Sequence, residues 1–108
     1  MRLRLSLGCG VFVSALVALA GGAQENADAD RGKRTFSEAG CVMCHGPSGR
    51  GAEGPSLVPM ERDFPDFGRV VREGIGEMPG QAEEDVTDEQ IAIVYEFLVG
   101  LSPPSGEP

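Results

Sequence analysis

The sequence predicts an all-α fold with three or more helices, on the basis of three observations. Two segments, residues 64–75 and 87–101, carry apolar side chains at spacings of three and four positions, which is the period of a helix with one buried face. Glycines mark the end of the first segment, and the second has a capping box at its start and two prolines after its end. The chain has no run of alternating apolar and polar residues long enough to predict a strand, and it has no internal repeat.

The first 23 residues are predicted to be a secretory signal peptide. Residues 1–4 are basic, and residues 5–23 form an uncharged run whose small residues at its end suit cleavage after Ala20 or Ala23. A membrane anchor at residues 5–23 is the alternative, because these 19 residues approach the roughly 20 that span a bilayer. The segment therefore predicts export to the periplasm, with membrane contact only if the segment is retained.

Cleavage after Ala23 would leave residues 24–108 as one small domain. Two of the nine basic residues and none of the 17 acidic ones would be lost, so the net charge would fall from −8 to −10. Only about a third of the remaining residues are apolar, and chains this short usually need a disulfide, a metal or a prosthetic group for stability. The acidic surface argues against nucleic acid and predicts partners with a basic face.

The first helix of this domain is expected to begin at Asp28 or Asp30, either of which can cap it, after a polar leader. It is expected to run to about Ala39, with Gly40 as its C-terminal stop. Residues 46–59 contain four Gly and three Pro, so they are expected to form a loop.

Two further helices are expected. The second ends where Gly74 and Gly76 interrupt the pattern, and its spaced apolar side chains are Phe64, Phe67, Val70, Val71 and Ile75. The last helix begins with a capping box, in which Thr87 caps the helix and Gln90 reaches back. The two prolines after residue 101 prevent its continuation. The core-facing stripe of this helix is Ile91, Val94, Tyr95 and Leu98.

The cysteines and the histidine of the predicted mature chain all lie in residues 41–45, Cys-Val-Met-Cys-His, because Cys9 would leave with the signal peptide. The pattern C-x-x-C-H is the attachment signature of c-type haem. Two thiols at this spacing on a turn can add to the two vinyl groups of one porphyrin, and the next residue can offer its imidazole to the iron. The motif therefore predicts one haem c, attached to Cys41 and Cys44, with His45 as the proximal iron ligand.

Three other interpretations of the cysteine pair are weaker. A disulfide across two residues would close a very short loop and constrain little of the unfolded chain. A thioredoxin-like redox pair would need a strand-helix-strand pattern around it, which the sequence lacks. A zinc site would need a second pair of Cys or His ligands, and the chain has none.

Together these residues resemble the class I c-type cytochromes of the small monohaem bacterial kind. The resemblance covers residues 28–101 in order and rests on the C-x-x-C-H motif, on Gly-Pro-Ser-Leu at residues 54–57 and on Met78-Pro79. It implies a cytochrome c-like fold, in which the helices wrap around one covalently bound haem. It also implies that the Pro55 carbonyl accepts the free N–H of the proximal histidine.

The resemblance further implies how the first and last helices meet. Gly32 and Phe36 are similar to the family's first-helix glycine and aromatic, which pack against an aromatic on the last helix, here Tyr95. This chain lacks much of the middle loop of larger relatives, so the family's contacts to the haem propionates cannot be transferred. Arg50 and Arg62 are candidates for such contacts, although each is more often a solvated surface charge.

Three methionines of the predicted mature chain compete for the distal side of the iron. Met43 lies inside the attachment turn and cannot reach the other haem face. Met60 follows His45 by 15 residues inside a Pro-rich loop, whereas Met78 follows it by 33 and comes just after a predicted helix. On the residues alone Met78 could simply fill a gap in the core. The resemblance implies that Met78 is the distal ligand.

With both axial positions filled, the site predicts electron transfer and no catalysis, because the iron offers no open position for a substrate. The expected function is a periplasmic one-electron carrier, and the alternative is a fixed haem subunit of a membrane or periplasmic dehydrogenase or oxidase complex. A sensor with an open sixth position requires that Met78 does not bind. The chain is acidic and Lys33 is its only lysine, so redox partners are expected to dock on it through a basic patch of their own.

Overall fold

The computed structural model describes residues 8, 10 and 20–102, so most of the predicted signal peptide lies outside the described residues. The described part contains four helices and one small antiparallel sheet of two strands, which confirms the all-α prediction. No helix in this part of the chain is long and apolar enough to cross a membrane. In chain order the elements are α1 (Ala20–Glu38), α2 (Val42–His45), α3 (Phe64–Glu73), β1 (Gly74–Ile75), β2 (Met78–Pro79) and α4 (Asp88–Leu101).

Helix α1 is longer than the sequence predicted. It begins at Ala20, so the expected polar leader is helical, and Asp28 and Asp30 lie inside the helix instead of capping it. Four alanines within residues 20–30 and the absence of proline there favour helix continuation over a cap at either aspartate. The predicted end is confirmed, since the helix ends at Glu38 and Gly40 follows with a φ of 85°.

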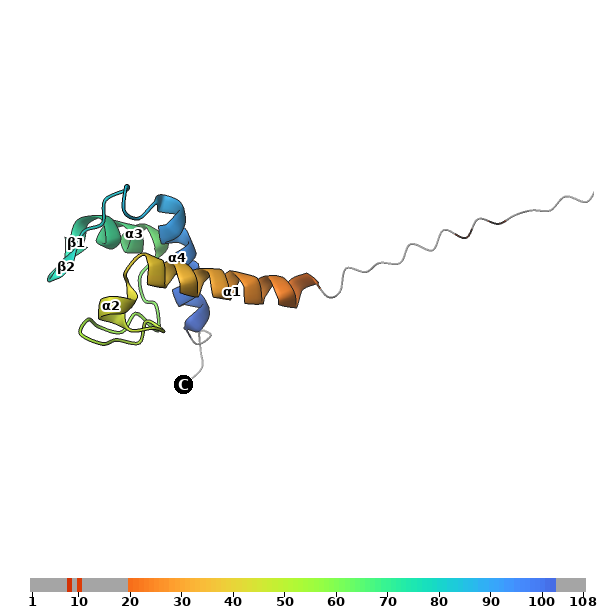
Figure 1. Cartoon of the computed structure of the whole chain (residues 1–108), viewed down its shortest axis with the longest axis horizontal. Helices are drawn as coiled ribbons and strands as arrows, with labels where there is room; N and C mark the ends of the chain where they lie inside the picture. The colour runs from red at the N-terminus through yellow and green to blue at the C-terminus, as the bar shows by residue number, and fades with distance from the viewer. Residues whose placement is uncertain (1–7, 9, 11–19, 103–108) are drawn as a thin grey trace, which may run out of the picture.

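Helices α1 and α4 cross at a close contact (Figure 1). A Cβ atom built on Gly32 would lie 2.5 Å from the Cβ of Phe97, and the rings of Phe36 and Phe97 are 5.8 Å apart. The aromatic partner on α4 is therefore Phe97, and the expectation of Tyr95 was wrong. Residues two apart on a helix point in widely different directions, and Tyr95 instead packs against Phe67 of α3.

This contact predicts opposite effects for two glycine substitutions. We expect Gly32→Ala to lower the free energy of unfolding by about 1–3 kcal/mol, because the added methyl overpacks the crossing. Gly68→Ala is the matched control, since Gly68 lies inside α3 with nothing within 4 Å of a built Cβ, and it is expected to stabilise by about 0.5–1 kcal/mol. Urea unfolding followed by circular dichroism measures both, and equal stability of the two variants would contradict the close approach.

Helices α3 and α4 have the capping that their sequences indicate. The Asp63 carboxylate accepts the backbone N–H of Asp66 at 2.9 Å at the start of α3, and Gly74 ends the helix with a φ of 79°. The capping box of α4 is complete, with hydrogen bonds of 3.1 and 2.9 Å between Thr87 and Gln90. The predicted stripe of α4 faces the core, where the buried residues are Phe36, Phe67, Val86, Ile91, Val94 and Leu98.

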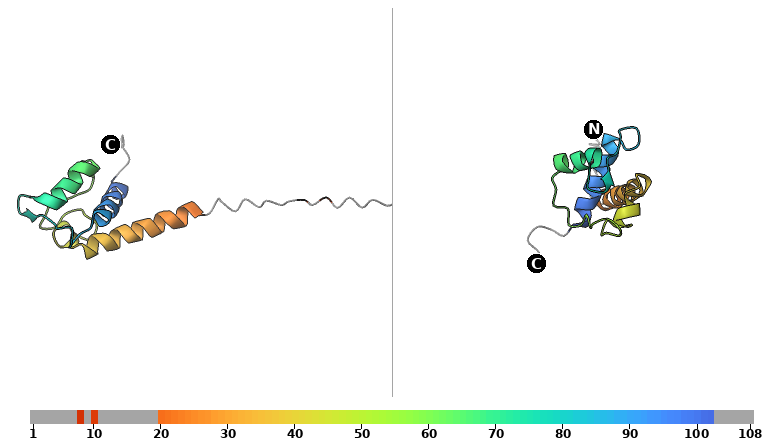
Figure 2. Two further views of the ribbon diagram at one scale, coloured as in Figure 1. Left: turned by 90° about the horizontal axis from the view of Figure 1, so that it is seen from above. Right: turned by 90° about the vertical axis from the view of Figure 1, so that its left-hand side faces the viewer.

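The remaining segments lie at one end of the domain. Residues 46–63 contain neither helix nor strand, which agrees with the loop predicted at residues 46–59. The β1–β2 hairpin follows α3 directly, with Ile75 paired to Met78. Figure 1 and Figure 2 show that α2 and this hairpin lie at the end of the domain opposite to the start of α1.

Candidate functional site

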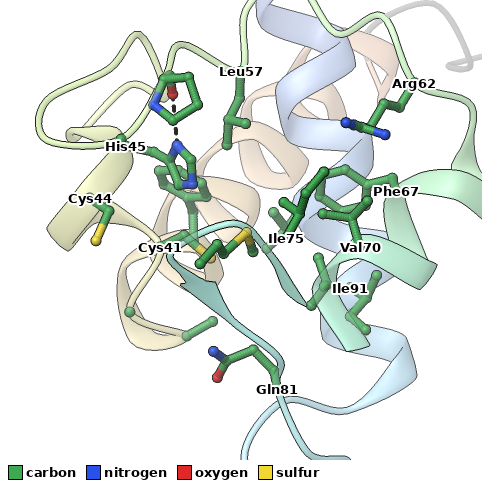
Figure 3. Close-up of a pocket in the computed structure, with 18 of the residues that line it drawn as sticks. Cys41, Cys44, His45, Leu57, Arg62, Phe67, Val70, Ile75, Gln81 and Ile91 are labelled. Atoms are coloured by element: carbon green, nitrogen blue, oxygen red, sulfur yellow. Dashed lines mark hydrogen bonds between the residues drawn. The ribbon is translucent and has the colours of Figure 1, made fainter. Parts of the chain in front are cut away.

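A cavity of about 870 Å³ opens between α2, the loop that follows it, the β1–β2 hairpin and the inner faces of α3 and α4 (Figure 3). This volume lies in the range of roughly 300–1,000 Å³ that is usual for small-molecule and cofactor sites. All four residues predicted to hold a haem line it, namely Cys41, Cys44, His45 and Met78. Its apolar wall includes Leu57, Phe67, Val70, Ile75, Ile91 and Val94.

The attachment motif forms helix α2 and the residue before it. Gly40 turns the chain sharply after α1, and the backbone N–H of Cys41 then donates to the carbonyl of Phe36 at 3.1 Å. Cys41 and Cys44 are both free thiols, so no disulfide joins them. Cys41 is half-buried and Cys44 is exposed, and burial raises the pKa of the Cys41 thiol. Both cysteines therefore border the cavity as free thiols, which is the state that covalent attachment to a cofactor requires.

His45 ends α2 and is buried, with 8% of its surface exposed. Its Nδ1 lies 2.7 Å from the carbonyl oxygen of Pro55, as the family resemblance implied. Because a carbonyl can only accept, Nδ1 carries the proton and donates it, which leaves the lone pair of a neutral ring on Nε2. Figure 3 shows the second ring nitrogen of His45 on the side of the ring opposite this hydrogen bond, toward the cavity. The imidazole is thus held in the tautomer and orientation of a metal ligand.

Backbone hydrogen bonds hold the Pro55 carbonyl in place. The N–H of Gly54 donates to the carbonyl of Cys44 at 2.7 Å, and the N–H of Gly51 donates to the carbonyl of His45 at 2.8 Å. A Cβ built on Gly54 would lie 3.2 Å from the Cε1 of His45, so only glycine lets the loop come this close without a shift of the ring. The glycine at position 54 therefore helps to keep the ring of His45 in its position.

Two thioethers line the cavity. Met78 is half-buried on β2, and its backbone carbonyl lies so close to Gly74 of β1 that any side chain there would collide with it. Met60 is also half-buried in the lining, and its backbone N–H donates to the hydroxyl of Ser102 at 2.7 Å. Met43 is 79% exposed and lies outside the lining, as expected for a residue that points away from the site.

The charged residues at the cavity were not predicted as a group. Three exposed carboxylates, Glu53, Glu61 and Glu77, belong to the lining, and they come from positions with no regular spacing, so no sequence signal connects them. Arg62 also lines the cavity, where its guanidinium pairs with the Asp66 carboxylate at 2.6 Å.

Asp66 accepts hydrogen bonds from two arginines, Arg69 and Arg62, and these bonds hold the pKa of its carboxyl below the usual value. Arg62 is therefore partly neutralised at the cavity. Arg50, the other candidate for propionate contacts, is exposed and is not part of the lining.

This set of side chains fits a covalently bound haem. Two free thiols stand beside an imidazole whose Nε2 is available, a thioether lies in the same cavity, and the walls are largely apolar. Cysteine thiols that add to the porphyrin vinyl groups, with an imidazole and a thioether as iron ligands, are the groups that hold c-type haem. Among the described residues, no group of three or more His, Cys, Asp or Glu side chains is placed to hold a metal ion directly.

Comparison with known proteins agrees with this donor set. Residues 27–98 match the family described as cytochrome c oxidase, cbb3-type, subunit III. The cytochrome c subunit of the menaquinol:cytochrome c reductase of Bacillus subtilis (strain 168) is 34% identical over 68 residues, which are 62% of this chain and 26% of that protein. The chain thus spans about a quarter of the length of that relative. No solved structure shows significant similarity. The chain belongs to the cbb3-type subunit III family of cytochrome c domains, which carry haem c and transfer electrons.

Proposed function

We propose that the protein is a one-electron carrier with one haem c, attached through Cys41 and Cys44 and ligated by His45 and Met78. The observation that carries this proposal is the 2.7 Å hydrogen bond from His45 Nδ1 to the Pro55 carbonyl, beside a cavity that the other three residues also line. A haem bound here would supply an iron that cycles between its ferric and ferrous states.

Different groups of the chain would set the reduction potential of that iron. The Pro55 carbonyl increases the donor strength of His45 by drawing on its Nδ1 proton. The soft thioether of Met78 favours ferrous iron and raises the reduction potential. The apolar wall excludes water, and with both axial positions filled no substrate can bind the iron. We therefore assign no catalytic residue to this chain.

The proposal is tested by producing the full chain in a host that matures c-type cytochromes. Haem that stays with the polypeptide on a denaturing gel, and a mass increase of one haem, are the expected results. The reduced protein is also expected to bind no carbon monoxide. Haem that is released by denaturant would contradict attachment through the two cysteines, and ready carbon monoxide binding would contradict ligation by Met78.

The carboxylates of the cavity support a partner with a basic docking face. Glu53, Glu61 and Glu77 are exposed at the lining, and none of them forms an ion pair with another described residue. Opposite charges on a partner would steer it to the cavity mouth, which is the shortest route to the haem. A partner with lysines or arginines around its own redox centre fits this surface.

Neutralising these three glutamates to glutamine is expected to slow association with a basic redox partner about tenfold or more at low ionic strength, with little effect in high salt. The matched control neutralises Glu83, Glu84 and Asp85, which are exposed but lie outside the cavity lining. Both variants change the charge equally, so stopped-flow electron transfer separates a local docking surface from the effect of net charge. Equal slowing by the two variants would count against docking at the cavity.

A fixed subunit is the second candidate, because the Bacillus subtilis relative is the cytochrome c subunit of a menaquinol:cytochrome c reductase. We propose export to the periplasm in either case, with the segment before Ala23 removed or kept as an anchor. Purification from periplasm and from membranes, with N-terminal sequencing, distinguishes the candidates. A free species that begins after Ala20 or Ala23 supports the diffusible carrier, and a stoichiometric large partner supports the subunit.

A further inference from the structure

Arg72 of α3 makes a cluster of hydrogen bonds that neither the capping of α3 nor the cavity requires. Its side chain is only 22% exposed, and its guanidinium donates to the carbonyls of Gln81 at 3.1 Å and Val86 at 2.6 Å, and to the Asp88 carboxylate at 2.5 Å. The first two acceptors lie in the segment that follows Met78, and the third is the first residue of α4. One side chain therefore joins α3, the chain after the hairpin and the start of α4.

These bonds close the base of the hairpin that carries Met78. The backbone N–H of Gln81 donates to the carbonyl of Val71 at 2.8 Å, so Gln81 is bonded to two neighbouring residues of α3. Gly80 also lies directly against the Arg72 carbonyl, in a space that no side chain could enter. The hairpin leaves α3 at Gly74 and is fastened back onto α3 at Gln81, which is only three residues after Met78.

We propose that Arg72 is a positioning residue for Met78, which keeps the thioether at the iron and sets how readily an external ligand displaces it. This inference rests on the ligand set proposed above. Without the Arg72 bonds, the segment from Gly74 to Thr87 would keep its strand pairing and the Gln81–Val71 backbone bond, but it would lose both side-chain bonds that tie it to α3. Such a connection opens locally at a lower free-energy cost than a short, fastened hairpin.

The role of Arg72 is separable from overall packing. Helices α3 and α4 remain in contact through Tyr95, whose ring lies 5.4 Å from that of Phe64 and 5.2 Å from that of Phe67. Loss of Arg72 should therefore release the hairpin while the two helices stay packed. The attachment turn and His45 lie on other elements and share no hydrogen bond with Arg72.

The test compares Arg72→Gln with Arg69→Gln in the haem-loaded protein. Arg69 is three residues earlier on α3, and its ion pairs among the described residues are with Asp66 and Glu73 of the same helix. Imidazole is titrated into the ferric protein while the absorption band of the iron–methionine bond is followed. We expect Arg72→Gln to bind imidazole about tenfold more tightly than wild type, which is the effect of losing a charge-assisted hydrogen bond network, and Arg69→Gln to match wild type.

The possible results test the role of Arg72 separately from the proposed iron ligands. Equal imidazole affinity in the two variants would overturn the role of Arg72 and leave the ligand set intact. A wild-type protein without the iron–methionine band would overturn the ligand set and, with it, this inference. If Arg72→Gln does not fold, Asp88→Ala removes one acceptor, and it must shift imidazole binding in the same direction by a smaller factor. An unchanged affinity in that variant would also overturn the proposal.

Discussion

Replacing both Cys41 and Cys44 by alanine is expected to give a chain that retains no haem and does not fold. Five of the six buried apolar side chains of the core, all but Leu98, line the cavity of about 870 Å³, so they would face water in a chain without haem. Chains this short usually need a prosthetic group, a metal or a disulfide for stability. The two thiols would attach the haem that fills this cavity.

The measurements are haem staining of a denaturing gel, far-UV circular dichroism and limited proteolysis. Met43→Ala is the control, because Met43 lies between the two cysteines and is 79% exposed. It changes the same turn without removing a thiol, and it should keep both haem and helicity. A double cysteine variant that keeps native helicity without haem would show that the helices pack independently of the cofactor.

Replacing Met78 by alanine is expected to open the iron to carbon monoxide and cyanide and to lower the reduction potential. A site that loses its thioether loses its preference for ferrous iron. Each tenfold loss of that preference lowers the potential of a one-electron couple by about 59 mV, so we expect a fall on the order of 100 mV. Haem attachment should be unaffected, since both cysteines remain. Potentiometry and carbon monoxide binding measure the two effects.

Met60→Ala is the control for this experiment, because Met60 is the other half-buried thioether in the cavity lining. It should leave the potential and the carbon monoxide binding close to those of the wild type. If Met60→Ala opens the iron and Met78→Ala does not, the distal ligand is Met60. Both methionines line the cavity, so the two variants together identify which of them binds the iron.

Local signals in the sequence predicted helices α3 and α4 well. Gly74 and the Thr87–Gln90 box act through hydrogen bonds and backbone angles within a few residues, so they can be read without knowledge of the fold. The start of α1 was missed for a related reason. A cap competes with continuation of the helix, and the alanines before Asp28 favoured continuation.

Contacts between distant segments were harder to predict. The resemblance implied Tyr95 as the aromatic that meets Gly32, whereas Phe97 meets it, because the rotation of α4 about its axis decides which side chain faces α1. The three glutamates at the cavity and the acceptors of Arg72 meet through loops, where no periodicity relates sequence to position. The attachment motif was predictable because its chemistry requires a fixed spacing within one turn.

The loop that holds the Pro55 carbonyl is joined to the attachment turn by backbone hydrogen bonds. Its hydrogen bonds run from Gly51 to His45, from Gly54 to Cys44 and from Leu57 to Gly49, and each joins a backbone N–H to a backbone carbonyl. The exposed side chains between these glycines can therefore vary without altering the electron donation of the histidine, and they belong to Pro47, Ser48, Arg50, Ala52 and Glu53. Adaptation of this surface to a new partner and adjustment of the driving force for electron transfer can then proceed independently in evolution.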